Sequence, residues 1–147
     1  MAVTYRIDRP TGIVLFEDDG LFDFAQWQRA VLGALQDPAA GRHRFLSDRR
    51  HLTAPPSLGL LEEILGFVQA HSTELGEAQW ALLAQRGTAV HDAMNLAEEL
   101  ASSTRVRVRA LTDLKRALAW LVPFSPETEV QRVERWIEGT PGSAGLT

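Results

Sequence analysis

The sequence predicts an α/β protein: a mixed, mostly parallel five-stranded sheet with helices on both faces and one extra helix at the C-terminus. The first observation is that short apolar segments alternate along the chain with longer segments whose apolar residues recur at helical spacing. The second is that residues 13–16 and 80–84 are continuously apolar, as in strands buried on both faces. Strands that alternate with helices favour parallel pairing through right-handed crossovers.

The composition is that of an ordinary globular domain. The chain has 147 residues, of which 45% are hydrophobic and 23% charged, and it is long enough to bury one core. A formal net charge of -4 argues against binding to nucleic acid or to an anionic membrane surface. Cysteine is absent, which excludes disulfides and thiol chemistry, and we find no signal peptide and no membrane-spanning run. We therefore expect a cytoplasmic protein.

The first two strands are predicted to form an antiparallel hairpin. Residues 3–8 alternate between apolar and polar side chains, which is typical of a half-exposed edge strand. Residues 9–12 contain proline and glycine and form the turn before the apolar run 13–16. Residues 17–20 (Glu-Asp-Asp-Gly) are expected to be an acidic loop.

Two helices and one strand follow. A helix begins after the N-cap Asp23 and ends at Asp37, because a residue before proline avoids helical dihedral angles. The third strand is predicted near residues 45–46. A second helix begins at Ser57 and is expected to stop near Gly76.

The remaining elements repeat this alternation. Residues 80–84 form a central strand, and a helix capped by Thr88 continues to residue 100. Residues 105–109 alternate arginine and valine, which indicates an edge strand with one wet face and charge that discourages aggregation. A further helix, capped by Thr112, closes before Pro123.

The C-terminal region differs in character, so we divide the chain into a domain over residues 1–123, an amphipathic helix over 124–138 and a flexible tail over 139–147. Serine and proline at 125–126 are typical of a helix start. The apolar stripe of this helix needs a cover. Its own domain can provide that cover, or a two-fold dimer contact can.

Ligands of open parallel sheets bind beyond the carboxyl ends of the strands. We expect the loops at these strand ends to form the binding site of the molecule. Their candidate ligand-binding or partner-binding residues are Asp48, Arg49, Arg50, His51, Ser57, Arg86 and Thr88.

Each candidate has alternatives. Ser57 is either a simple helix cap or a phosphoacceptor whose phosphate would lie beside Arg49 and Arg50. These arginines either bind an anion or belong to a solvated loop in which Asp48 pairs with one of them. Asp18, Asp19 and Asp48 do not have the spacing of a known metal-binding loop. The sequence also lacks the Gly-x-Ser-x-Gly motif of serine hydrolases. We therefore expect no metal site, no cofactor and no catalytic residue.

Two segments carry a resemblance to a known family: residues 45–50 (Phe-Leu-Ser-Asp-Arg-Arg) and residues 106–121, which end in Ala-Trp-Leu. Together with the element order, they resemble the SpoIIAA-like family, which has the STAS fold of anti-sigma-factor antagonists and is discussed beside the Sec14 lipid-carrier fold. The resemblance covers roughly residues 3 to 122. It implies a small bacterial domain that is usually non-enzymatic.

The phosphorylatable antagonists carry Asp-Ser-Ser-Gly-Leu at the start of the second helix. The matching segment here is Pro-Ser-Leu-Gly-Leu over residues 56–60, so proline replaces the acidic residue and leucine replaces one serine. Ser57 is the one serine of this segment, and the departure from the family motif argues against a phosphorylation switch like that of the antagonists.

The sequence thus predicts a non-catalytic STAS-like protein-interaction or regulatory domain, with a protein partner or a homodimer, without bound nucleic acid and without membrane insertion. The alternative is a carrier or sensor of a small amphipathic or lipid-like ligand. Such a ligand would lie between the second helix and the sheet, near Leu61, Leu65 and Phe67, with Arg49 or Arg50 on its acidic head.

Overall fold

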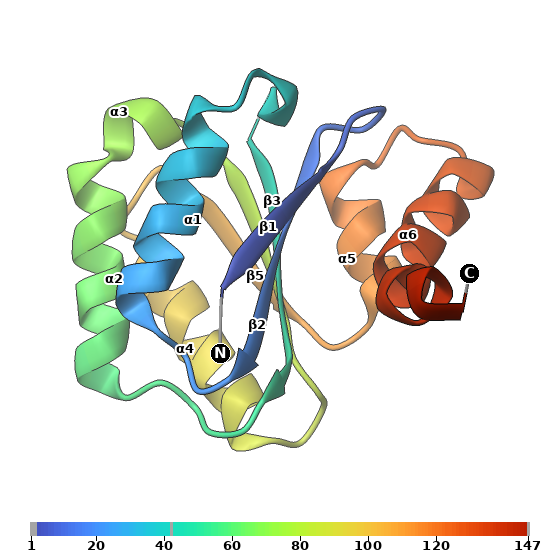
Figure 1. The fold of residues 1–147 in the computed structure, drawn as a ribbon. Coiled ribbons are helices and arrows are strands. Elements are labelled where there is room, and N and C mark those ends of the chain that lie inside the picture. Colours follow the sequence, from blue (N-terminus) through green and yellow to red (C-terminus); the bar gives the residue numbers. More distant parts are fainter. Residues whose placement is uncertain (1–2, 42, 147) are drawn as a thin grey trace.

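The computed structural model describes residues 3–41 and 43–146, with side chains described as far as Gly139 (Figure 1). Its centre is a five-stranded sheet in which spatial order follows chain order. The strands are β1 (Thr4–Asp8), β2 (Ile13–Gly20), β3 (Arg44–Leu52), β4 (Gln79–Leu83) and β5 (Arg107–Leu111). β1 pairs antiparallel with β2, and every other neighbouring pair is parallel. The predicted α/β class and the mixed, mostly parallel sheet are confirmed.

Helices cover both faces of the sheet, as Figure 1 shows. Because the strands are added in chain order, right-handed crossovers place all of the connecting helices on one face. These helices are α1 (Phe24–Gln36), α2 (Leu58–Ala70), α3 (Ser72–Leu75) and α4 (Ala89–Ala101). The helices that follow the last strand, α5 (Leu114–Leu121) and α6 (Glu127–Leu146), lie on the other face.

Each layer has its own hydrophobic core, and β2 contributes to both. Val14 and Phe16 pack toward α1, α2 and α4, while Ile13 and Leu15 pack toward α5 and α6. Successive strand residues point to opposite faces. A strand buried on both faces therefore has a continuous apolar run, which is the pattern seen in the sequence.

Helix starts agree with the expected caps in three cases. The side chains of Asp23, Ser57 and Thr88 each accept a hydrogen bond from the backbone N–H three residues later. The predicted Thr112 cap of α5 is wrong. Asp113 is the cap, because its carboxylate accepts from the Lys115 N–H at 3.0 Å.

The second helix is shorter than predicted. α2 ends at Ala70, and His71 leaves helical geometry with φ -109° and ψ 27° before the single turn of α3. Gly76 ends that turn with φ 56°, a conformation that glycine adopts without strain. The boundary near Gly76 is thus retained, but two helices reach it instead of one.

Two strands are longer than predicted. The expected acidic loop over residues 17–20 is the end of β2, and β3 continues to Leu52. Charged residues are tolerated there because several have partners of opposite charge. Glu17 pairs with Arg6 at 3.1 Å, and Asp18 pairs with Arg49 at 2.9 Å.

Helix α6 packs on its own domain. Val130, Val133 and Ile137 are buried in the core beneath α5 and α6. Of the two covers considered for this stripe, the structure uses the domain itself. The helix runs to Leu146, past the expected end at residue 138, and the flexibility of residues 139–147 stays a prediction.

Candidate ligand-binding site

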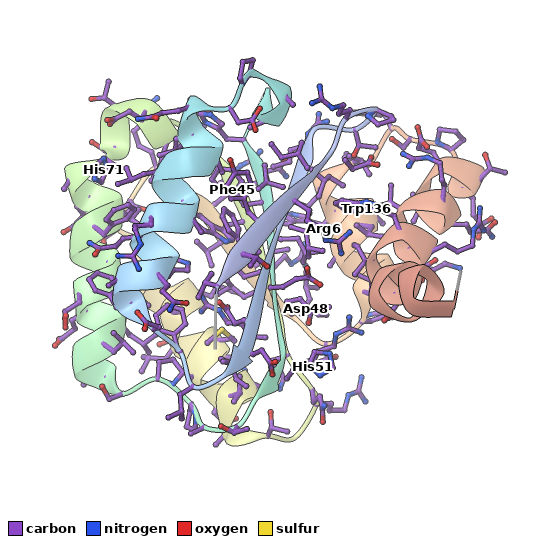
Figure 2. The ribbon with its side chains drawn as sticks, in the orientation of Figure 1. Arg6, Phe45, Asp48, His51, His71 and Trp136 are labelled. Carbon is purple, nitrogen blue, oxygen red and sulfur yellow. The ribbon has the colours of Figure 1, made fainter. Side chains whose placement is uncertain are left out.

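The carboxyl end of β3 supplies the charged residues of the candidate site. Asp48, Arg49, Arg50 and His51 were expected in a loop, but they lie within the strand. They therefore point alternately to opposite faces of the sheet. In Figure 2, Asp48 lies on the α6 side of the strand and His51 lies at its end. The side chains of Arg49 and Arg50 consequently point into different helical layers.

Arg49 points into the layer that contains α1, α2 and α4. Its side chain is only 3% exposed, and its Nε donates to the Oδ2 of Asp18 at 2.9 Å. Its Nη1 lies 3.4 Å from the sulfur of Met94, and the guanidinium carbon lies 4.9 Å from the ring centre of Phe22. A charged group is thus held in an otherwise apolar layer by one strong partner and two weak ones.

Asp18 is equally buried and only half satisfied. Its Oδ1 has no hydrogen-bond partner among the described residues. Burial raises the pKa of this carboxyl above its ordinary value, the charge and hydrogen bond of Arg49 oppose the rise, and the nearby charge of Asp48 adds to it. The buried pair is therefore incompletely hydrogen-bonded, because one carboxylate oxygen and several guanidinium hydrogens have no strong partner.

Arg50 points to the opposite layer. It forms a two-pronged hydrogen bond with Asp48, at 2.9 and 2.8 Å, and its Nη1 donates to Glu138 of α6 at 2.9 Å. These contacts hold the pKa of Arg50 above its ordinary range. Arg50 of β3 is therefore connected to α6 through its ion pair with Glu138.

Ser57, Arg86 and Thr88 lie on the loops at the same end of the sheet. The Oγ of Ser57 is occupied as a cap by the Leu60 N–H at 3.1 Å, and the Thr88 hydroxyl donates to the Gln85 carbonyl at 2.7 Å. His51 and Arg86 are exposed. Arg49 and Arg50 are both paired with carboxylates, so a phosphate on Ser57 would have to compete with those pairs.

A cavity of about 60 Å³ lies beside Arg49, between α2, α4 and the sheet. Its wall is mostly apolar, and the guanidinium is its only charged group. The lining residues are Trp27, Arg49, Leu61, Ile64, Leu65, Val68, Trp80, Leu82, Ala97, Leu100, Ala101, Val106 and Val108. Half-buried residues of both helices form its rim, so the cavity reaches toward the surface.

The cavity is lined by some of the residues that were predicted to contact an amphipathic ligand. Leu61 and Leu65 line it, whereas Phe67 packs against Trp27, with ring centres 5.1 Å apart. Of the two arginines considered, Arg49 lines the cavity and Arg50 does not. No feature of the sequence indicated that Trp27 of α1 would line a cavity. The pairing of Asp18 with Arg49 could not be predicted because residues 17–20 were expected to form a loop.

The described part of the chain contains no group of three or more His, Asp or Glu side chains arranged to hold a metal ion. Within those same residues, no helix is long and apolar enough to span a membrane. Comparisons with protein-family models, with curated proteins and with solved structures find no match for this chain.

Proposed function

We propose that this protein is a non-catalytic binding protein that holds a small apolar molecule in the cavity between α2 and α4. The observation that carries the proposal is the cavity itself, whose wall is mostly apolar and contains a single charged side chain. Apolar cavities in proteins stay dry and accept apolar guests, and a cavity of about 150 Å³ holds benzene. The smaller volume here encloses a short aliphatic group, and the rest of a longer molecule extends past the half-buried rim.

Burial of the guest supplies the binding energy. Each methylene group moved from water into an apolar site contributes about 0.8 kcal/mol. The half-buried Ile64, Leu65 and Leu100 at the rim leave a route by which a longer chain extends toward the surface.

The experiment fills the cavity from α4. Ala97→Leu adds a larger side chain to the wall, and Ala119→Leu makes the same change at an exposed position of α5. Pentane is the probe, and amide NMR spectra and tryptophan fluorescence are the readouts, because Trp27 and Trp80 line the cavity. We expect pentane to shift the signals of the unmodified chain and of Ala119→Leu, and to lose its effect in Ala97→Leu. Equal responses in all three proteins would reject the cavity as the site.

A second candidate is the STAS-like protein-interaction domain that the sequence resembles. One observation favours it: Leu21, directly after β2, and Leu58, the first residue of α2, are 65% and 54% exposed. The segments that precede them are joined, because the Thr53 N–H donates to the Gly20 carbonyl at 2.8 Å. Exposed aliphatic side chains on adjacent loops are suited to contact with another protein.

A photo-crosslinking residue introduced in place of Leu58 tests this candidate, with one in place of the exposed Ala119 as the control. Sedimentation of the crosslinked sample separates a second copy of the chain from a different partner. Crosslinks that form equally at both positions would argue against a partner surface at the start of α2.

A further inference from the structure

The guanidinium of Arg49 has more hydrogen-bond donors than the protein satisfies. It carries five N–H groups. Asp18 accepts from Nε, and the sulfur of Met94 is a weak acceptor for Nη1. No described residue accepts a hydrogen bond from Nη2. Since Arg49 is 3% exposed and lines the apolar cavity, these donors are available to a molecule bound in the cavity.

Charge decides which acceptor fits. The sequence alone suggested an acidic head on this arginine, but Asp18 already neutralises it inside the layer. Asp48 lies close enough to act on Asp18, and its own charge is matched by Arg50. The Asp18–Arg49 and Asp48–Arg50 pairs are neutral, and Glu138 on Arg50 adds one negative charge, so a carboxylate on Arg49 would add a further, uncompensated negative charge beside Asp18. A buried charge without a partner is costly, whereas a neutral acceptor adds a hydrogen bond without that cost.

We propose that the ligand of this cavity is an uncharged carbonyl compound, such as a ketone, an ester or an amide, whose oxygen accepts from the unsatisfied N–H groups of Arg49. Its aliphatic part lies against Leu61, Leu65 and Ala97. This inference rests on the proposed function, because it assigns the ligand class of the same cavity.

Three probes of similar size separate the chemical classes. Pentane has no acceptor, methyl propyl ketone adds a neutral one, and butyrate adds a charged one. The affinity of each is measured at pH 7 on the full chain by NMR titration. We expect the ketone to bind at least about tenfold more tightly than butyrate, since a buried, unmatched charge opposes the acid. Butyrate binding that equals or exceeds ketone binding would overturn the assignment.

A double variant isolates the role of Arg49. Asp18→Leu combined with Arg49→Met removes both charges together, which avoids leaving one of them buried alone. We expect it to reduce the affinity for the ketone relative to that for pentane by about tenfold, as for the loss of one hydrogen bond to a charged donor. The matched control is Asp48→Leu with Arg50→Met, which alters the pair that faces α6 and leaves the preference for the ketone intact.

The outcomes distinguish the two proposals. If pentane and the ketone both bind in a way that Ala97→Leu abolishes, but the Asp18→Leu/Arg49→Met variant leaves the ratio of their affinities unchanged, the carbonyl assignment is wrong and the apolar site stands. If no probe responds to Ala97→Leu, the apolar site itself is wrong. The comparison of ketone with butyrate uses the unmodified chain, so it tests the assignment even if the double variant fails to fold.

Discussion

Arg49 and Asp18 face each other in the interior with an Nε–Oδ2 distance of 2.9 Å, and their side chains are 3% and 1% exposed. The contact joins β2 to β3 where the register of the two strands shifts between Glu17 and Asp19. The irregular strand end is thus held by an ion pair in addition to the backbone ladder. Because the pair is buried and incompletely hydrogen-bonded, replacing one member and replacing both members should change the stability of the fold by different amounts.

The first prediction concerns stability. Asp18→Leu alone leaves the Arg49 charge buried without a partner, so we expect the free energy of unfolding to fall by about 3–5 kcal/mol. Asp18→Leu with Arg49→Met removes the orphaned charge, and most of the lost stability should return. Urea denaturation monitored by tryptophan fluorescence measures both. A double variant as unstable as the single one would show that the pair matters through its shape rather than its charge.

The second prediction concerns the pH dependence of stability. Burial, opposed by Arg49, raises the pKa of Asp18 above its ordinary 3.8 in the folded state. The folded protein therefore binds this proton more readily than the unfolded chain does. The free energy of unfolding should lose a contribution as pH rises from 3.8 through the raised pKa, and the loss should be complete above it. The difference between the unmodified chain and Asp18→Leu/Arg49→Met isolates this contribution, and a difference of opposite slope would refute it.

The third prediction concerns Asp8 and Arg132, which join the β1–β2 hairpin to α6. Two N–H···O contacts of 2.9 Å connect them. Burial alone would raise the pKa of Asp8, but the hydrogen bonds of Arg132 and Thr11 and the charge of Arg132 lower it. The stabilising contribution is therefore present above pH 3.8 and is lost as pH falls through the lowered pKa.

Arg132→Met should reduce the free energy of unfolding at pH 7 by about 1–2 kcal/mol. The substitution leaves the buried Asp8 carboxylate without its charged partner, but the loss is moderate because Arg132 is partly exposed to solvent. The deficit should shrink in acid once Asp8 is protonated. Arg135→Met is the control, since Arg135 is exposed on the same helix. Denaturation curves across the acid range give both values, and a deficit independent of pH would contradict the assigned role of the ion pair.

The fold was predictable because its strongest signals are local. The apolar runs at residues 13–16 and 80–84 report strands covered on both faces, and the caps Asp23 and Thr88 mark helix starts within a few residues. The end of β3 was not predictable in this way. Its charges resemble a loop until their partners are known, and those partners, Asp18 and Glu138, lie 31 and 88 residues away in sequence.

The candidate site was predictable only in part for the same reason. Once β3 is known to extend past Asp48, strand alternation alone sends Arg49 and Arg50 to opposite faces. The cavity depends instead on how closely α2 approaches α4 above the sheet, a distance that no local pattern encodes. The sequence could therefore suggest Leu61 and Leu65 as a ligand surface but could not show which arginine they adjoin.

The fourth prediction separates the two interpretations of Ser57. Its hydroxyl caps α2, so Ser57→Ala should lower the free energy of unfolding by about 1 kcal/mol. Ser57→Asp should preserve stability within a few tenths of a kcal/mol, because aspartate caps equally well and its charge suits a helix N-terminus. If the hydroxyl is only a cap, Ser57→Asp also leaves pentane binding unchanged, as NMR titration can show. An altered affinity in Ser57→Asp at unchanged stability would instead indicate that negative charge at the start of α2 controls the cavity.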